Sequence, residues 1–429
     1  MNKNQPKAVA KAAALKLGVA DDNLKLLQEA GGGSIKSLKR FTSKAKLYLR
    51  RTQFAYGAAA PTDQHQLKIN AGKNQPESIY LHVGKLDMHS ENAGMNEAKL
   101  HEITCGNDMQ LRCIIGRKYM KFLNNSDKHI KSILPHIIYE NLGKKAENFK
   151  FIGGGSYGRV YKTTLSDGEI IAVKAYLLEG MNQEEAYQLK VLSEHTRVKM
   201  PQVLFTYEDD NTGILAMSFV EGQNVLNPSF LLKSKAQKQK FADEVTDGML
   251  QWHQVKSDKY GALADPKYDT WYDYYQAERQ IPWLKGLQEL SDKGKFSKKK
   301  MALLYESTEI FNSLPQESEG AVLIHCDLNI MNIMADPKTF KLTGFIDPCG
   351  SIWADREYDL FQYRNMWGDA YGLYETYKNK CKMSEYTDFR VAYYGAMLEA
   401  SMRLKGGHTV PLWEDLNFAR LKREMKKLK

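Results

Sequence analysis

The sequence lacks the features of disulfide-stabilised, zinc-binding and membrane-spanning proteins. Its 429 residues include only five cysteines, an odd number, and no two of them form a Cys-x-x-Cys pair. This spacing indicates neither a disulfide framework nor a zinc site. No apolar run approaches the roughly 20 residues that a bilayer-spanning helix needs. The apolar residues between Ala8 and Leu15 are interrupted by a lysine, so they do not form a signal-peptide core. We therefore expect a cytoplasmic protein, although export without such a signal stays open.

The composition is that of a globular protein with an excess of positive charge. An apolar share of 43% is enough for a sizeable core, and the length allows one very large domain or two to three ordinary ones. The formal net charge of +10 favours contact with anions. This excess does not require nucleic acid, because a solvated basic surface explains it more simply.

The most informative segment is 325–332, with the sequence His-Cys-Asp-Leu-Asn-Ile-Met-Asn. Asn332 stands five residues after Asp327, and Asp347 follows fifteen residues later at the end of an apolar pair. Phosphoryl transfer from ATP needs a carboxylate that accepts or orients the proton of the attacked hydroxyl. It also needs an amide oxygen and a second carboxylate that hold Mg²⁺ against the phosphates. Asp327, Asn332 and Asp347 have the types, order and spacing for these roles. The segment therefore predicts an ATP-dependent kinase of a small molecule.

A glycine-rich segment upstream supports this prediction. Residues 153–160 contain G-x-G-x-x-G-x-V, and Lys174 ends an Ile-Ala-Val-Lys run sixteen residues after Gly158. Glycines let a backbone approach phosphates closely, and the lysine neutralises their charge. A dinucleotide-binding loop uses the same letters but is followed by a helix. Here two β-prone runs flank a turn at 166–168, which predicts a hairpin. The predicted nucleotide-binding residues of this region are Gly153, Gly155, Ser156, Gly158, Val160 and Lys174.

Residues 183–192 have helical periodicity and offer a carboxylate that could pair with Lys174. We select Glu185, with Glu184 as the fallback, and a solvated glutamate is the alternative for either. An apolar strand from Ile214 then leads into a linker between lobes. Backbone groups near Ser218 and Val220 would hold adenine there.

The remaining sequence is mostly helical in pattern. Residues 241–253 form a helix with an apolar stripe, and its last residue, His253, is expected to be packed rather than catalytic. The aromatic-rich residues 271–275 are expected to pack in the core, and the alternative is that some of these rings line the acceptor pocket. Apolar residues spaced by three and four positions between Phe418 and Leu428 predict an amphipathic terminal helix that docks on the large lobe.

Residues 1–145 differ from the rest and carry no motif with a clear chemistry. A basic stretch at 36–51 could contact a phosphate-rich partner, although such runs are more often solvated helix faces. A macromolecular partner of this region stays open. Its histidines (His82, His89 and His101) lack metal-ligand spacing.

The motifs resemble those of the aminoglycoside phosphotransferase and fructosamine kinase group, from about Phe149 to the C-terminus. Residues 346–348, Ile-Asp-Pro, stand where protein kinases carry D-F-G, and no A-P-E segment follows. Residues 355–360, D-R-E-Y-D-L, are similar to a block of fructosamine kinase relatives, and 271–279 are similar to an aromatic helix of theirs more loosely. The resemblance implies an α+β, bilobal, protein-kinase-like fold. Its parts would be an N-terminal α/β extension (1–145), a β-rich small lobe (146–222) and a helical large lobe (223–429).

The resemblance also implies a role for each matching residue. Asp327 would be the catalytic base, and Asn332 and Asp347 would hold Mg²⁺. The other roles are a lysine that grips the phosphates, a glutamate that orients it, and two residues that brace the catalytic loop; these are Lys174, Glu185, and His325 with Asp359. Cys326 departs from the glycine that is common after the histidine in this group, but a small residue still fits there.

Three functions remain open at this point. The leading hypothesis is phosphorylation of a hydroxyl on an aminoglycoside, an amino sugar or a related metabolite. The second is a protein kinase or an effector that modifies a macromolecule and is recruited through residues 1–145. The absence of D-F-G and A-P-E segments from this chain argues against it. A non-catalytic nucleotide-binding scaffold does not explain why every catalytic residue is present. Truncation of residues 1–145 would separate these hypotheses. For a cationic acceptor, the acidic candidates are Asp265, Asp269, Asp273 and Glu278.

Overall fold

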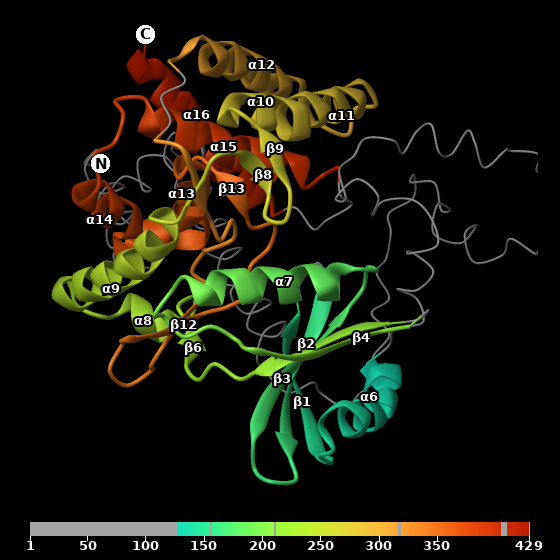
Figure 1. The fold of residues 1–429 in the computed structure, drawn as a ribbon. Coiled ribbons are helices and arrows are strands. Elements are labelled where there is room, and N and C mark those ends of the chain that lie inside the picture. The colour runs from blue at the N-terminus through green and yellow to red at the C-terminus, as the bar shows by residue number, and fades with distance from the viewer. Residues whose placement is uncertain (1–126, 155–156, 210–211, 316–318, 405–409, 429) are drawn as a thin grey trace, which may run out of the picture.

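The computed structural model describes residues 127–154, 157–209, 212–315, 319–404 and 410–428. These residues form two lobes, a β-rich small lobe and a mostly helical large lobe (Figure 1). The predicted α+β, bilobal class is therefore confirmed. The segments predicted between residues 1 and 126, and the loop residues Gly155 and Ser156, lie outside the described residues.

The small lobe is built on one antiparallel sheet of five strands. The predicted hairpin is present, since the second and third strands pair in continuous register from Gly158 opposite Tyr176 to Thr164 opposite Ile170. In spatial order the strands are β1 (Ala146–Gly154), β2 (Gly158–Leu165), β3 (Ile170–Tyr176), β5 (Gly213–Ser218) and β4 (Val203–Glu208).

Each face of this sheet is covered by one helix, because successive side chains of a strand point to opposite faces. On one face Ile171 and Val173 pack in a cluster with Ile130 and Leu134 of α6 (Asp127–Leu142). On the other face, the alternate residues of β3 pack toward α7 (Met181–Glu194), which contributes Leu189 and Leu192 to the main core. Helix α6 precedes the boundary at 146 that the sequence suggested, yet it forms an outer layer of the small lobe (Figure 1).

The chain crosses to the large lobe through a short strand that pairs with a hairpin of that lobe. Strand β6 (Gln223–Asn224) lies against β11, with Asn224 opposite Met334. This pairing joins the linker to the segment that follows the predicted catalytic loop. The three strands are, in order, β12 (Leu342–Phe345), β11 (Ile333–Ala335) and β6.

A second set of short strands leads into the predicted catalytic loop. Strands β10 and β13 are antiparallel, with Leu323 opposite Trp353, and β10 leads directly into His325. The order is β7 (Lys256–Ser257), β10 (Ala321–Leu323), β13 (Ile352–Ala354), β8 (Tyr260–Ala262) and β9 (Pro266–Tyr268).

Helices make up the rest of the large lobe around a core rich in aromatic side chains. Trp271 packs on Tyr358 and Tyr394, with ring centroids 5.0 and 6.3 Å apart. The predicted helices at 241–253 and near the C-terminus are confirmed. The predicted aromatic helix is split into α10 and a π-helical turn. The helical elements are α8 (Pro228–Leu231), α9 (Lys235–His253), α10 (Trp271–Tyr275), π-helix η2 (Gln276–Gln280), α11 (Ile281–Asp292), α12 (Lys298–Ser313), α13 (Glu357–Arg364), 3₁₀ helix η3 (Asn365–Tyr371), α14 (Leu373–Lys380), α15 (Thr387–Ser401) and α16 (Pro411–Leu428). Within the described residues, no helix combines the length and apolarity required to cross a membrane.

Candidate active site

The β11–β12 hairpin brings two of the predicted site residues together. Ile333 pairs with Phe345, and the N–H of Ile346 donates to the carbonyl of Asn332 over 3.0 Å. The hairpin also brings the side-chain Nδ2 of Asn332 to 3.4 Å from the backbone carbonyl oxygen of Asp347. The fifteen residues between Asn332 and Asp347 thus form a hairpin, which returns the chain to the neighbourhood of Asn332.

Asp327 accepts hydrogen bonds from three side-chain amides. Its Oδ1 accepts from Asn329 Nδ2 at 2.9 Å and from Gln362 Nε2 at 2.7 Å. Its Oδ2 accepts from Asn332 Nδ2 at 3.0 Å. These donors fix the orientation of the carboxylate, which is the group that would meet a substrate hydroxyl.

The surroundings of Asp327 favour its neutral form. Burial raises the pKa of the Asp327 carboxyl to about 8, and the negative charge of Asp347 acts in the same direction. The hydrogen bonds from Asn329 and Asn332 and the charge of Lys174 oppose this rise. A divalent cation beside Asp327 would lower the pKa of its carboxyl.

Lys174 lies between two carboxylates that come from different lobes. Its Nζ is 2.5 Å from Glu185 Oε2 and 2.5 Å from Asp347 Oδ1. Burial alone would lower the pKa of Lys174, but the charges of Asp347 and Glu185 outweigh it and raise that pKa. Tyr176 also donates to Glu185 at 2.5 Å. The other candidate, Glu184, instead accepts from Gln188 at 3.1 Å.

The glycine-rich hairpin covers the side chain of Lys174. A Cβ on Gly158 would lie 2.9 Å from the carbonyl oxygen of Ala175 and 3.4 Å from two carbons of Lys174. Val160 pairs directly with Lys174 across β2 and β3. Gly153 pairs with Val160 where β1 approaches the loop. Any side chain at position 158 would therefore crowd the side chain of Lys174. This is a steric reason for glycine that does not depend on a nucleotide.

Asp359 holds the backbone of the catalytic loop. It is fully buried on α13 and accepts from the backbone N–H of His325 at 3.2 Å and of Cys326 at 2.8 Å. His253 Nε2 lies 3.3 Å from the same carboxylate, and Tyr377 Oη lies 2.7 Å from His253 Nδ1. The packed role expected for His253 agrees with these contacts. His325 is also fully buried, and desolvation lowers its pKa to about 4.

Two residues of the site have a left-handed backbone. Cys326 has φ of 68° and Asp347 has φ of 58°. This conformation brings Cβ close to the following carbonyl in any residue except glycine. It explains why glycine suits the position after the histidine, and Cys326 is strained there even though its side chain is small enough.

The oxygen donors at the site fit a magnesium ion. The side-chain Nδ2 of Asn332 donates hydrogen bonds to Asp327, so Oδ1 of Asn332 is the atom available to a metal ion. Together with the carboxylate of Asp347 it gives the hard oxygen donors that Mg²⁺ prefers. Within the described residues no cluster of three or more His, Cys, Asp or Glu side chains forms a complete metal site. Phosphate oxygens and water would have to complete the coordination, as is usual for Mg²⁺ with nucleotides.

At the linker between the lobes, Ser218 and Val220 both make contacts within the protein. The N–H of Ser218 donates to the carbonyl of Gln202 at 2.8 Å, and Ser218 Oγ accepts from the N–H of Gln202 at 2.9 Å. Val220 is buried and packs close to Gly344. Contact of adenine with the backbone near Ser218 and Val220 stays a prediction.

The sequence analysis missed Asn329 and Gln362 among the partners of Asp327. Asn329 was visible inside the catalytic motif, two residues after Asp327. Gln362 lies three residues after Asp359 on the same helix, so it shares the face that meets the catalytic loop. That helical spacing was the available signal.

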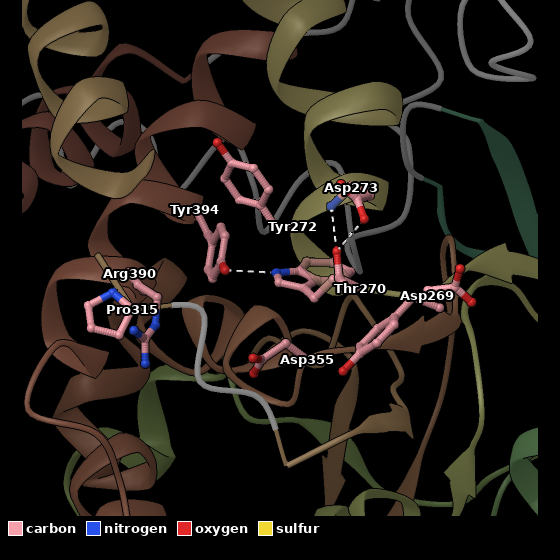
Figure 2. A pocket seen from close by; sticks show the side chains of 10 residues that line it. Asp269, Thr270, Tyr272, Asp273, Pro315, Asp355, Arg390 and Tyr394 are labelled. Carbon is pink, nitrogen blue, oxygen red and sulfur yellow. Dashed lines mark hydrogen bonds between the residues drawn. The ribbon is translucent and has the colours of Figure 1, made fainter. Parts of the chain in front are cut away.

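A cavity of about 440 Å³ opens in the large lobe, and its lining includes no residue of the catalytic loop (Figure 2). Asp355 borders it directly after β13, at the end of the β10–β13 pair opposite to His325. The lining has three carboxylates, one arginine, four aromatic rings, a threonine and a proline; these residues are Asp269, Asp273, Asp355, Arg390, Tyr260, Trp271, Tyr272, Tyr394, Thr270 and Pro315.

Two charged residues of the lining are paired with residues outside it, since Asp269 lies 3.1 Å from Lys259 and Arg390 pairs with Glu357. Arg390 donates to both carboxylate oxygens of Glu357, which is not part of the lining. Of the four acidic candidates from the sequence, only Asp269 and Asp273 border the cavity. Asp265 pairs with Lys267 at 2.9 Å, and Glu278 accepts from Tyr268 at 2.5 Å.

Comparison with known proteins places the described fold in a group. The family model described as "phosphotransferase enzyme family" matches residues 148–396, more than half of the chain. An uncharacterized protein of Escherichia coli strain K12, YcbJ, is 21% identical over 197 residues, which are 45% of this chain and 65% of that protein. The match thus spans slightly less than two thirds of the relative's length.

Solved structures agree with this match at the level of the fold. A candidate fructosamine-3-kinase from Thermobifida fusca YX-ER1 has a TM-score of 0.51 and 20% identity, over 67% of this chain and 98% of the other. An aminoglycoside phosphotransferase in complex with GDP and kanamycin has a TM-score of 0.50 and 14% identity, over 70% of this chain and 99% of the other. The kinase-like fold and the resemblance drawn from the motifs are confirmed.

Proposed function

The chain belongs to the phosphotransferase enzyme family, and from this premise we propose that it moves the γ-phosphate of ATP to a hydroxyl of a small molecule, with Mg²⁺ at the site. One observation carries the proposal. Lys174 from the small lobe contacts Asp347, and Asn332 contacts both Asp347 and Asp327. Four residues from three segments thus meet in one place, with the charges and donors that a triphosphate requires.

In this proposal the residues of the chain act mainly by positioning and charge neutralisation. Lys174 binds the α- and β-phosphates, and Glu185 holds its ammonium group in place. Asn332 and Asp347 hold Mg²⁺, which neutralises charge on the phosphates when bound. Asp327 orients the acceptor hydroxyl and takes its proton. His325 and Asp359 keep the catalytic loop in shape from behind.

The acceptor that we propose is an aminoglycoside, an amino sugar or a related metabolite. Support comes from the cavity of Figure 2, which is lined by carboxylates and aromatic rings. An amine is attracted both by carboxylates and by the faces of aromatic rings. The cavity does not border Asp327, so it would hold an amine distant from the hydroxyl that is phosphorylated.

The proposal is tested by ATP turnover against a mixed panel of amino sugars, glycated amines, aminoglycosides and nucleosides. Asp327→Asn is the blank, because it keeps the shape of the side chain and removes the base. We expect at least one acceptor to give a phosphorylated product, detected by mass, and the blank to lose on the order of a hundredfold or more in turnover. Equal turnover in the wild type and the blank would refute the assignment of Asp327.

A further inference from the structure

A continuous chain of buried side-chain amides connects Asp327 with the C-terminal helix. Gln362 Nε2 donates to Asp327 Oδ1 at 2.7 Å, and Asn365 Nδ2 donates to Gln362 Oε1 at 3.0 Å. Asn417 of α16 donates through Nδ2 to Asn365 Oδ1 at 3.0 Å, and Arg420 Nη1 donates to Asn417 Oδ1 at 3.1 Å. Each of the three amides is about one-twentieth exposed or less. We call this chain of residues the amide relay.

Arg420, at one end of the amide relay, fixes the direction of every hydrogen bond in it. A guanidinium only donates. Arg420 therefore requires the oxygen of Asn417 on its side, which turns the nitrogen of Asn417 toward Asn365, and the same reasoning carries on to Gln362. All donors point toward Asp327, so the bonds polarise one another in the same sense.

The second hydrogen of each asparagine is also used. Asn417 Nδ2 lies 3.0 Å from the carbonyl of Trp413, and Asn365 Nδ2 lies 3.5 Å from Glu399 Oε1. Room for the relay depends on Gly395 of α15, where a Cβ would come within 2.8 Å of Asn417 Oδ1. Helix α15 packs against both α13 and α16 (Figure 1). A polar network that is satisfied in this way specifies one arrangement of its members.

We propose that Gln362 and Asn417 are positioning residues for Asp327, so that α16 is part of the catalytic apparatus rather than only a packing element. Gln362 holds one carboxylate oxygen, and Asn417 holds Gln362 in its donating orientation through Asn365. The proposal rests on the function proposed above and deepens it. The residues concerned lie in α13, η3 and α16, and none of them would touch the nucleotide.

The first test is a double-mutant cycle on turnover. Gln362→Leu removes the donor to Asp327, and we expect kcat to fall by about tenfold or more with KM for ATP unchanged, as for a lost hydrogen bond to a charged group. Asn417→Leu should lower kcat by a smaller factor. The double variant should be no slower than Gln362→Leu alone, because both changes break one chain. Independent factors that multiply would overturn the relay.

Two further variants separate positioning from stability. Asn417→Asp keeps the shape and the acceptor for Arg420 but cannot donate to Asn365. Its new oxygen would face the acceptors on Asn365 and Trp413, so we expect its kcat to fall severalfold when measured well below its melting temperature. Leu421→Ala is the matched control, since Leu421 is a fully buried residue of α16 outside the relay. It should lower the melting temperature and leave kcat unchanged well below that temperature. A fully active Asn417→Asp would contradict the proposal.

A readout without catalysis keeps the two proposals distinguishable. In protein labelled with ¹⁵N-glutamine, the side-chain signal of Gln362 is assigned by its loss in Gln362→Leu. Asn417→Asp should shift this signal, and Leu421→Ala should not. A shift without turnover on any acceptor supports the relay and refutes the proposed function. An unshifted signal in Asn417→Asp overturns the relay whatever the turnover.

Discussion

Lys174 Nζ lies 2.5 Å from Asp347 Oδ1, and the two residues are 173 positions apart in the sequence. The contact joins β3 of the small lobe to the segment after β12 of the large lobe. Since Asp347 is also the proposed metal ligand, its carboxylate would have to serve both the lysine and the ion. Nucleotide and metal together would then draw the lobes into one arrangement.

Asp347→Asn should remove the metal dependence of nucleotide binding. An amide is a weaker ligand for Mg²⁺ and carries no charge to neutralise. We expect the ATP affinity in Mg²⁺ to fall by about tenfold or more, toward the value without the ion. Calorimetric titration of ATP with and without Mg²⁺ measures this. Asp247→Asn, which changes a surface carboxylate paired with Lys380, is the control, and a full Mg²⁺ effect in Asp347→Asn would contradict the assignment.

Two adjacent glutamates of α7, Glu184 and Glu185, allow the role of the partner of Lys174 to be tested with a matched control. Glu185→Gln removes the charge that holds Lys174, so kcat/KM for ATP should fall by about tenfold or more. Glu184→Gln changes a residue that bonds Gln188, and it should alter kcat/KM by less than about twofold. Steady-state kinetics at varied ATP would decide. Equal effects of the two substitutions would remove the reason for choosing Glu185.

The protein should be more stable with glycine than with alanine at position 326. With φ of 68°, the strain arises from Cβ, which alanine keeps and glycine lacks. Both substitutions lose the same sulfur contacts, so their difference isolates the backbone. We expect Cys326→Gly to be more stable than Cys326→Ala by about 1 kcal/mol, measured by denaturant unfolding. If alanine is the more stable of the two, the backbone at this position is not strained.

The buried His325 should make the protein less stable in acid. Its folded-state pKa is lowered to about 4 by desolvation, whereas in the unfolded chain it is near 6.5. The unfolded state therefore binds more protons between these values, and stability falls as pH drops from 6.5 toward 4. The loss would be on the order of 3 kcal/mol.

Melting temperatures between pH 7.5 and 4.5 test this effect against a matched pair. His325→Gln should show a shallower decline than the wild type, because its side chain does not titrate. His136→Gln, at an exposed position on α6, should keep the decline of the wild type. Parallel curves for all three proteins would mean that His325 takes up no protons on unfolding.

Asp273→Asn tests whether the cavity of Figure 2 holds the amine of an acceptor. Its carboxylate would attract an ammonium group, so KM for an amine-bearing acceptor should rise severalfold to about tenfold, with kcat at saturation little changed. Asp265→Asn is the control, because Asp265 lies nearby but outside the lining. If both variants keep the KM of the wild type, the acceptor amine binds elsewhere.

The sequence indicated the parts of the site that are encoded by short spacings. A turn at 166–168 between β-prone runs predicts the β2–β3 hairpin, and that pairing alone brings Val160 opposite Lys174. The fifteen residues from Asn332 to Asp347 fold back as the β11–β12 hairpin. Local pattern is sufficient in such cases because the two partners belong to one supersecondary unit.

The amide relay could not be read from the sequence. Asn417 lies 52 residues from Asn365, and nothing local distinguishes it from other polar residues of an amphipathic helix. Its role depends on how α13, α15 and α16 pack. The strain at Cys326 was missed for a different reason, since residue size was considered and backbone conformation was not. Helix α6 was missed because the sequence change near 146 resembles a boundary.

Helix α6 also decides how a shortened form of this protein should be prepared. A version that starts at residue 146 would leave the apolar side chains of Ile171, Val173 and Ile214 without the cover of α6, and such a surface promotes aggregation. It would also lose the hydrogen bond from Tyr161 to Asp127. Expression should start at or before Asp127, so that failure to fold is not mistaken for loss of a recruiting function.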